Sequence, residues 1–204
     1  MNISSVKNLG IVIIAAGNSS RLGQAKQLVE ISGVSLLQKT VSIAEELSKH
    51  SVCILGHNAG RFELNLEASS CKIIVNKNWQ LGMGSSIACG VDFFVDKVEA
   101  VMILLCDQYR LTTTDLNQLV ELWENEPDKI IASQYFEKKC NKLIEAAPAI
   151  FPKQYFDSLL ALKEKGARDI LKKNQKNVIT ILSENSAFDL DTEDDLKLLF
   201  SDTI

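Results

Sequence analysis

The chain lacks the cysteine and histidine spacing of a metal or disulfide framework. Its five cysteines are scattered and never form a C-x-x-C pair, so neither a zinc site nor a set of disulfides is indicated. Its two histidines, His50 and His57, have no partners at the spacing of a metal site or a catalytic triad. We therefore expect no Ser-His-Asp or Cys-His nucleophile, and we interpret both histidines as surface or loop residues.

The chain also lacks an apolar run of the length that a membrane-spanning helix needs. Its first nine residues have none of the basic, apolar and small-residue regions of a signal peptide, so we expect a cytoplasmic location and no membrane partner. Lys and Arg number 22 against 26 Asp and Glu, which gives a net charge of −4. This balance argues against a nucleic-acid polymer as partner, although a local group of Arg and Lys could still bind a small anion.

Short apolar runs alternate with amphipathic segments, which is typical of βα units that form a mostly parallel sheet flanked by helices. No repeat, low-complexity tract or linker divides the sequence, so we predict one α/β domain over residues 1–204. The predicted strands are 10–14, 51–55, 72–75, 101–105, 129–132, 149–151 and 178–182. The predicted helices are 36–48, 85–94, 115–125, 153–162, 168–173 and 192–200, the last with Thr192 as its cap and Asp195 in its first turn.

The segment after the first predicted strand has the composition of a phosphate-binding loop. Its glycines and serines allow tight turns that aim N–H groups inward, while Arg21 and Lys26 add positive charge. It matches neither G-x-G-x-x-G nor the P-loop pattern, which argues against a dinucleotide fold and a P-loop NTPase. The alternative is a βα turn whose glycines only make the bend. The residues predicted to bind nucleotide here are Ala15, Ala16, Gly17, Ser19, Arg21, Gly23 and Lys26.

A second Gly/Ser segment, 78–87, runs into the predicted helix 85–94. Its serines lie where a helix N-terminus offers free N–H donors, so the segment could hold a base, a ribose or a phosphate. The alternative is a strand-to-helix turn with serine caps and a packed Trp79. The residues predicted to bind nucleotide in this segment are Gly82, Gly84, Ser85 and Ser86.

Carboxylates follow two other predicted strands. Asp107 comes directly after the apolar run 101–106, and Asp189 and Asp191 alternate along the extended segment before the last predicted helix. A carboxylate at a buried strand end needs a cation or hydrogen-bond donors, and Mg²⁺ prefers hard oxygen ligands. We predict that Asp107 holds Mg²⁺ together with Asp189 or Asp191; the alternative is that Asp107 caps the next turn. Loops that follow parallel strands share one edge of the sheet, so we expect both Gly/Ser loops and Asp107 to meet.

Together these segments resemble the MobA-like nucleotidyltransferase family, and within it the molybdenum cofactor cytidylyltransferases. The resemblance implies a Rossmann-like nucleotidyltransferase fold, with the first loop on the triphosphate and Mg²⁺ on Asp107 and Asp191. It also implies that residues 82–84 and 166–168 lie near the acceptor or the base. The matching residues are Ala15-Ala16-Gly17-x-Ser19-x-Arg21-x-Gly23-x-x-Lys26, Gly82-Met83-Gly84-x-Ser86-Ile87, Cys106-Asp107-Gln108, Pro148-Ala149-Ile150-Phe151, Gly166-Ala167-Arg168 and Asp189-x-Asp191-Thr192-x-x-Asp195-Leu196.

The activity that this resemblance implies is transfer of CMP from CTP to the phosphate of a molybdopterin-type cofactor, with a molybdoenzyme as possible recipient. A phosphate monoester is largely ionised near pH 7, so no general base is needed. The catalytic residues predicted are Arg21 for the β- and γ-phosphates, Lys26 for the α-phosphate and Asp107 for the metal. Two alternatives stay open: a sugar or polyol phosphate as acceptor, and a non-catalytic accessory protein that binds nucleotide.

Overall fold

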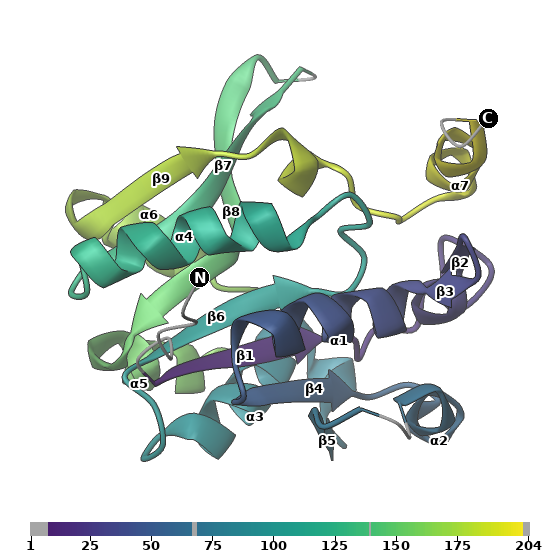
Figure 1. Ribbon diagram of the computed structural model, residues 1–204, viewed down its shortest axis with the longest axis horizontal. Coiled ribbons are helices and arrows are strands. Elements are labelled where there is room, and N and C mark those ends of the chain that lie inside the picture. Colours follow the sequence, from purple (N-terminus) through teal and green to yellow (C-terminus); the bar gives the residue numbers. More distant parts are fainter. Residues whose placement is uncertain (1–7, 67–68, 139, 202–204) are drawn as a thin grey trace.

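A seven-stranded sheet in the order β5-β4-β1-β6-β8-β7-β9 forms the centre of the computed structural model (Figure 1). The structure describes residues 8–66, 69–138 and 140–201, so both ends of the predicted 1–204 domain lie outside the described residues. β8 runs antiparallel to β6 and β7, and every other described pairing in this sheet is parallel, which confirms the prediction. The strands are β1 (Leu9–Ile14), β4 (Ser51–Leu55), β5 (Lys72–Val75), β6 (Ala100–Leu105), β7 (Ile130–Glu137), β8 (Lys142–Pro152) and β9 (Val178–Leu182).

Helices cover both faces of this sheet (Figure 1). α1 (Leu36–Leu47) and α4 (Thr113–Asn125) bury their apolar sides on one face, and α3 (Met83–Phe94), α5 (Phe156–Leu160) and α6 (Arg168–Lys173) do so on the other. Successive side chains of β1 point to opposite faces of the sheet and join a separate apolar core on each face: Ile11 and Ile13 pack with α1, and Val12 packs with α3. A strand covered on both faces reads as a continuous apolar run, which is why the central strands were predictable.

The predictions fell short where elements are exposed or short. β7 and β8 extend beyond the predicted 129–132 and 149–151 into a hairpin whose outer half, including the exposed Phe136, lacks a long apolar run. The predicted helix 153–162 is broken: 153–155 is a 3-10 turn, and α5 ends at Leu160. The small elements α2 (Ala59–Glu63), β2 (Glu30–Ile31) and β3 (Val34–Ser35) were not predicted. No helix in the described ranges is long and apolar enough to cross a lipid bilayer.

The last helix, α7 (Glu193–Ser201), begins where the sequence predicts. Thr192 Oγ1 accepts a hydrogen bond from the Asp195 backbone N–H at 3.2 Å, and Asp195 Oδ2 accepts one from the Thr192 N–H at 2.7 Å. Just before this cap, the chain pairs with the loop after β6: Gln108 and Asp189 form an antiparallel bridge, and Leu190 N–H donates to the Asp107 carbonyl at 3.0 Å. This bridge brings two acidic segments together that are far apart in sequence.

Candidate active site

The loop after β1 is held in shape by a buried glutamine. Gln27 is 1% exposed, and its Nε2 donates hydrogen bonds to the carbonyls of Ala15 at 2.9 Å and Gly17 at 3.0 Å. Ser19 Oγ accepts a hydrogen bond from the Lys26 backbone N–H at 3.1 Å. The two ends of the loop are therefore tied together by Gln27, which no motif identified, and by Ser19, which the motif includes.

This arrangement satisfies two of the loop carbonyls and leaves many loop N–H groups available. Within the described part of the chain, the N–H groups of Gly17, Asn18, Ser19, Gly23 and Gln24 make no hydrogen bond. Ser19 and Gly23 have φ values of 52° and 73°, a conformation that turns successive N–H groups toward one side. A Cβ added to Gly17 would meet no atom within 4 Å, so the space in front of the loop is open. A concave run of free N–H groups is suited to an anion.

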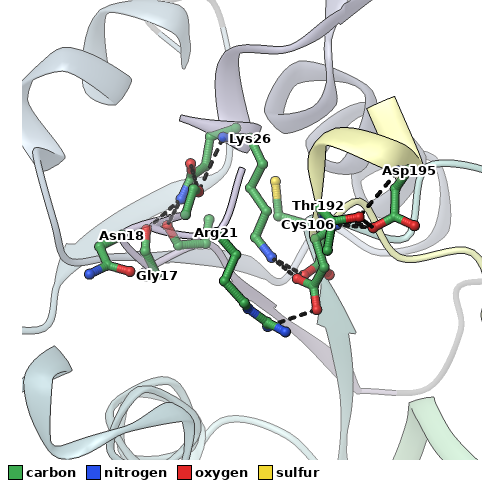
Figure 2. A network of polar contacts seen from close by, with 12 residues as sticks. Gly17, Asn18, Arg21, Lys26, Cys106, Thr192 and Asp195 are labelled. Carbon is green, nitrogen blue, oxygen red and sulfur yellow. Dashed lines mark hydrogen bonds and ion pairs between the residues drawn. The ribbon is translucent and has the colours of Figure 1, made fainter. Parts of the chain in front are cut away.

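Side chains from three segments meet beside this loop (Figure 2). Lys26 Nζ donates to Asp107 Oδ2, at the end of β6, and lies 3.0 Å from Asp191 Oδ1, just before α7. Arg21 Nη2 lies 2.9 Å from Asp191 Oδ2. The side chains of Lys26 and Asp107 are 17% and 16% exposed, whereas that of Arg21 is 71% exposed. The structure therefore brings together the predicted basic and acidic residues.

The electrostatics of this cluster follow from burial and proximity. Burial alone would lower the pKa of Lys26, but the charges and hydrogen bonds of Asp107 and Asp191 outweigh it and raise that pKa. Burial would raise the pKa of Asp191, but Lys26 and Arg21 bring it below its usual value. Asp189 has no such partner: burial, followed by the charges of Asp107 and Asp191, raises its pKa to about 7. Lys26 and Arg21 thus pair with Asp107 and Asp191, while Asp189 makes no ion pair among the described residues.

The carboxylate positions fit a divalent cation. Oδ1 of Asp107 and Oδ1 of Asp189 are both buried without a hydrogen-bond partner. No three His, Cys, Asp or Glu side chains among the described residues form a preformed metal site. Mg²⁺ does not need one, because it commonly binds through one or two carboxylates and completes its shell with substrate phosphates and water. Asp107 and Asp191 meet at Lys26, whereas the second unpaired oxygen belongs to Asp189, and a metal on Asp107 and Asp191 stays a prediction.

The second Gly/Ser segment uses its polar groups internally. Ser85 Oγ lies 2.8 Å from the Gly82 carbonyl, and Asn76 Nδ2 donates to the hydroxyls of Ser85 and Ser86 at 3.0 Å each. The Ser85 N–H donates to the Lys163 carbonyl at 2.7 Å. The polar groups of Gly82, Ser85 and Ser86 are thus engaged in the turn, with Asn76 or with the facing chain, and no described contact joins the four predicted residues to the charged cluster. Their nucleotide-binding role stays a prediction.

The glycines of this segment allow two backbones to approach closely. A Cβ on Gly82, whose φ is 116°, would lie 2.3 Å from the Glu164 carbonyl oxygen. A Cβ on Gly84 would lie 2.4 Å from the Lys165 carbonyl oxygen. The segment therefore fixes the position of residues 163–168, which carry the Gly166-Ala167-Arg168 triplet.

A cavity of about 450 Å³ borders the cluster. Its floor is apolar, formed by β6, β8 and α3, and Gln108 and Asp189 connect it to the charged residues. Tyr135 and Arg168 form part of its wall. Met83, Lys165, Gly166 and Ala167 also line it. The two resemblance segments, 82–84 and 166–168, thus meet at this cavity.

Sequence reasoning did not name Gln27 or Tyr135, and it named Gln108 only as part of the Cys106-Asp107-Gln108 match. Gln108 is 5% exposed; its Nε2 donates to the carbonyls of Ala147 and Ser186, both at 2.9 Å, and its Oε1 is buried without a partner. No local sequence pattern predicts that Gln108 or Gln27 is buried, because a polar residue next to a charged one is expected to be exposed. Tyr135 was missed because the outer half of β7 was not predicted.

Comparisons with known proteins agree with this geometry. Residues 11–178 match the family model described as the MobA-like NTP transferase domain. A probable molybdenum cofactor guanylyltransferase of Nostoc sp. is 26% identical over 197 residues, which cover 95% of this chain and 91% of that protein. Nicotine blue oxidoreductase of Paenarthrobacter nicotinovorans is 31% identical over 126 residues, which cover 61% of this chain and 60% of that protein.

The same fold occurs in solved structures. Rv0371C from Mycobacterium tuberculosis H37Rv, in complex with manganese, matches with a TM-score of 0.76 at 17% identity, over 96% of this chain and 99% of that one. The Rossmann-like α/β fold with helices on both faces of the sheet is confirmed.

Proposed function

Since the chain belongs to the MobA-like NTP transferase domain family, we propose that it transfers CMP from CTP to the phosphate of molybdopterin or molybdenum cofactor. An oxygen of the acceptor phosphate forms a bond to the α-phosphorus of CTP, and the bond from that phosphorus to the α–β bridging oxygen breaks. Pyrophosphate leaves with the bonding electron pair. The observation that carries the proposal is the meeting of Lys26, Asp107 and Asp191 beside a loop with free N–H groups.

Charge neutralisation is the main catalytic requirement, because two polyanions must approach each other. Lys26 would bind the α-phosphate and Arg21 the β- and γ-phosphates, with loop N–H groups as further donors. Both side chains already extend from the loop toward the carboxylates that would hold the metal (Figure 2). Mg²⁺ held by Asp107 and Asp191 would supply positive charge to phosphate oxygens and to the leaving pyrophosphate.

No side chain is assigned as a general base. A phosphate monoester has a second pKa of about 6, so the attacking oxygen is already ionised near neutral pH. The roles of the chain are therefore binding, orientation and electrostatic stabilisation.

The acceptor would occupy the cavity of about 450 Å³ beside Gln108 and Asp189. This volume lies within the range of about 300–1,000 Å³ that small-molecule sites have. Its apolar floor suits a flat ring system better than a polyhydroxylated sugar, and Lys165 and Arg168 could pair with an acceptor phosphate. This is the observation that favours a pterin over the alternative sugar or polyol phosphate.

The identity of the nucleotide base is the most specific part of the proposal. CTP follows from the branch whose motifs the chain resembles, whereas the Nostoc relative is named a guanylyltransferase. Transfer to a molybdoenzyme as recipient of the product belongs to the proposal as well.

The decisive experiment is a matrix of nucleotides and acceptors. Pyrophosphate release is measured with CTP, GTP, ATP and UTP, each with Mg²⁺, and each with molybdopterin, with a sugar phosphate or without acceptor. We expect release above background with CTP and molybdopterin together, and the CMP adduct of molybdopterin by mass spectrometry.

Each other outcome contradicts a defined part of the proposal. Release with GTP instead of CTP would overturn the base, and release with a sugar phosphate would overturn the acceptor. Tight CTP binding without release in any arm would favour a nucleotide-binding accessory protein. Absence of both binding and release would contradict the transferase activity and favour a different chemistry, of which the relative named as an oxidoreductase is one example.

A further inference from the structure

A second cavity, of about 340 Å³, lies between the loop after β1 and α2. Its lining differs in charge from that of the catalytic cluster, because it includes no Asp or Glu. It includes Arg61 and His57 on the α2 side and polar loop residues on the other. The lining residues are Gly17, Asn18, Ser19, Ser20, Gly23, Gln24, Ala25, Gln27, His57, Asn58, Arg61 and Phe62.

The wall formed by the loop is rich in donors. The N–H groups of Gly17, Asn18, Ser19, Gly23 and Gln24, which make no hydrogen bond within the described part of the chain, all belong to residues of this wall. The side chain of Ser20 is exposed and makes no described hydrogen bond. A cavity with many donors and no carboxylate is suited to an anion.

Arg61 differs from the other cations of the loop region. Lys26 and Arg21 are both engaged with carboxylates. The Arg61 side chain is exposed and makes no hydrogen bond or ion pair with any described residue. A guanidinium group can bind two phosphate oxygens at once, and it keeps its charge at every accessible pH. Arg61 is therefore a positive charge that no described residue neutralises.

We propose that this cavity binds the terminal phosphates of the nucleoside triphosphate, with Arg61 as their charged partner. The inference rests on the proposed function in one respect, that the ligand of the loop is a triphosphate. It adds a residue from α2 to a site that the sequence places on the loop after β1. Lys26 then acts at the α-phosphate, while Arg61 joins Arg21 in holding the phosphates that leave as pyrophosphate and contacts the end of that tail.

This placement predicts an effect on binding more than on the chemical step. The charge that develops when the bond at the α-phosphorus breaks falls on the β-phosphate, so Arg61 at the γ-phosphate, the far end of the tail, would stabilise ground state and transition state to a similar extent. Such uniform binding lowers KM and leaves kcat nearly unchanged. Nucleotides that lack the β- and γ-phosphates would not contact Arg61.

The test compares ligands that differ only in their phosphate tail. Dissociation constants of CTP, CMP, pyrophosphate and inorganic phosphate are measured by titration calorimetry with Mg²⁺ for wild type, Arg61→Gln and Arg61→Lys. We expect Arg61→Gln to weaken CTP and pyrophosphate about tenfold, equivalent to roughly 1.4 kcal/mol, and CMP less than twofold. Arg61→Lys should restore part of the affinity, because it returns the charge without the two-pronged geometry.

Lys49→Gln is the matched control, because it removes one exposed positive charge just before β4, at the opposite end of the sheet. This variant should bind all four ligands like wild type. Melting temperatures of all variants should agree, since neither side chain is buried. Where transfer is detected, Arg61→Gln should raise KM for CTP with kcat within about twofold of wild type.

The outcomes separate this proposal from the proposed function. If CTP binds but no acceptor is modified, and Arg61→Gln still weakens CTP and not CMP, the phosphate site stands while the transferase activity fails. If transfer occurs but Arg61→Gln binds CTP as wild type does, or weakens CMP equally, the phosphate site is overturned. Binding of free phosphate alone, without CTP, would show an anion site that does not serve the nucleotide and would also overturn it. Failure of wild type to bind any of the four would overturn both.

Discussion

The two Gly/Ser loops of this protein have similar compositions and opposite arrangements. The loop after β1 keeps its N–H groups free and lines a polar cavity. In the segment 78–86, by contrast, the serine hydroxyl groups form hydrogen bonds with Asn76 and within the turn, and the Ser85 N–H donates to the carbonyl of Lys163. Glycine in the first loop leaves space for a ligand, whereas glycine in the second lets another stretch of the chain approach.

The difference comes from the residues around each loop and not from the loops themselves. Gln27 approaches the first loop from the carbonyl side, so its amide bonds leave donors unpaired. Asn76 approaches the second loop from the hydroxyl side, and residues 163–165 cover it. A turn rich in glycine and serine after a strand therefore indicates that another group approaches its backbone closely. The neighbouring residues decide whether that group is a ligand or another part of the chain.

The largest effect is expected from Lys26, which belongs to the loop that we propose to bind the triphosphate. Lys26→Ala removes the charge assigned to the α-phosphate, and loss of one preorganised charge of this kind costs about 10²–10³ in kcat. Pyrophosphate release in the presence of CTP and acceptor measures it. Lys49→Ala, far from the site, should retain wild-type turnover. Turnover of Lys26→Ala within a few-fold of wild type would remove this residue from the catalytic step.

A pair of glycine substitutions tests the comparison directly. A Cβ at position 84 would lie 2.4 Å from the Lys165 carbonyl oxygen, so Gly84→Ala forces the two backbones apart. Overpacking of this kind costs about 1–3 kcal/mol, measurable by urea unfolding. Gly17→Ala meets no atom within 4 Å, so its stability should equal that of wild type.

Ligand binding should show the reverse order. The Gly17→Ala methyl group extends into the open space in front of the loop, and we expect KM for CTP to rise about tenfold, or roughly 1.4 kcal/mol. Equal losses of stability in both variants, or unchanged CTP binding in Gly17→Ala, would contradict the distinction between a ligand loop and a packing loop.

Magnesium should stabilise the first region and leave the second unaffected. Asp107 has a buried oxygen without a hydrogen-bond partner and meets Asp191 at Lys26, so the proposed cation on these two carboxylates would bind the folded state alone. At ten times its dissociation constant, Mg²⁺ should add about 1.4 kcal/mol to the free energy of unfolding, and EDTA should reverse this. Asp107→Asn should abolish the gain, while Asp128→Asn, exposed before β7, should keep it. A gain that survives Asp107→Asn would place the metal elsewhere.

Much of the fold was predictable because its central strands are covered on both faces. Continuous apolar runs identified the central strands β1, β4 and β6 nearly to the residue, and shorter apolar runs identified the edge strands β5 and β9. The rule that loops after parallel strands share an edge predicted that Lys26 and Asp107 meet. Which of Asp189 and Asp191 contacts Lys26 was not predictable, because the sequence places both on the same side of an extended segment. The structure places Asp191 on Lys26 and Arg21 and leaves Asp189 buried.

The rest could not be read from local pattern. Gln27 and Gln108 become important only through contacts with distant carbonyls, and no periodicity marks such a contact. Arg61 lies on a five-residue helix, which is too short to show a repeat. The sequence does not show which N–H groups of the two Gly/Ser loops are hydrogen-bonded. The partner of the Ser85 N–H, for example, is the Lys163 carbonyl, about eighty positions later in the chain.

The smallest effects are expected from a matched pair of serines, one in each loop. Ser85→Ala removes the hydroxyl that bonds the Gly82 and Asn78 carbonyls and accepts from Asn76 Nδ2, which should cost about 0.5–1.5 kcal/mol of stability and leave KM for CTP unchanged. Ser20→Ala removes an exposed hydroxyl without a described partner, so its stability should stay within about 0.5 kcal/mol of wild type. Because Ser20 lines the polar cavity, its KM for CTP should rise slightly. If Ser85→Ala instead raises KM with stability intact, the second loop binds nucleotide after all, and its hydroxyl groups must leave their present partners to do so.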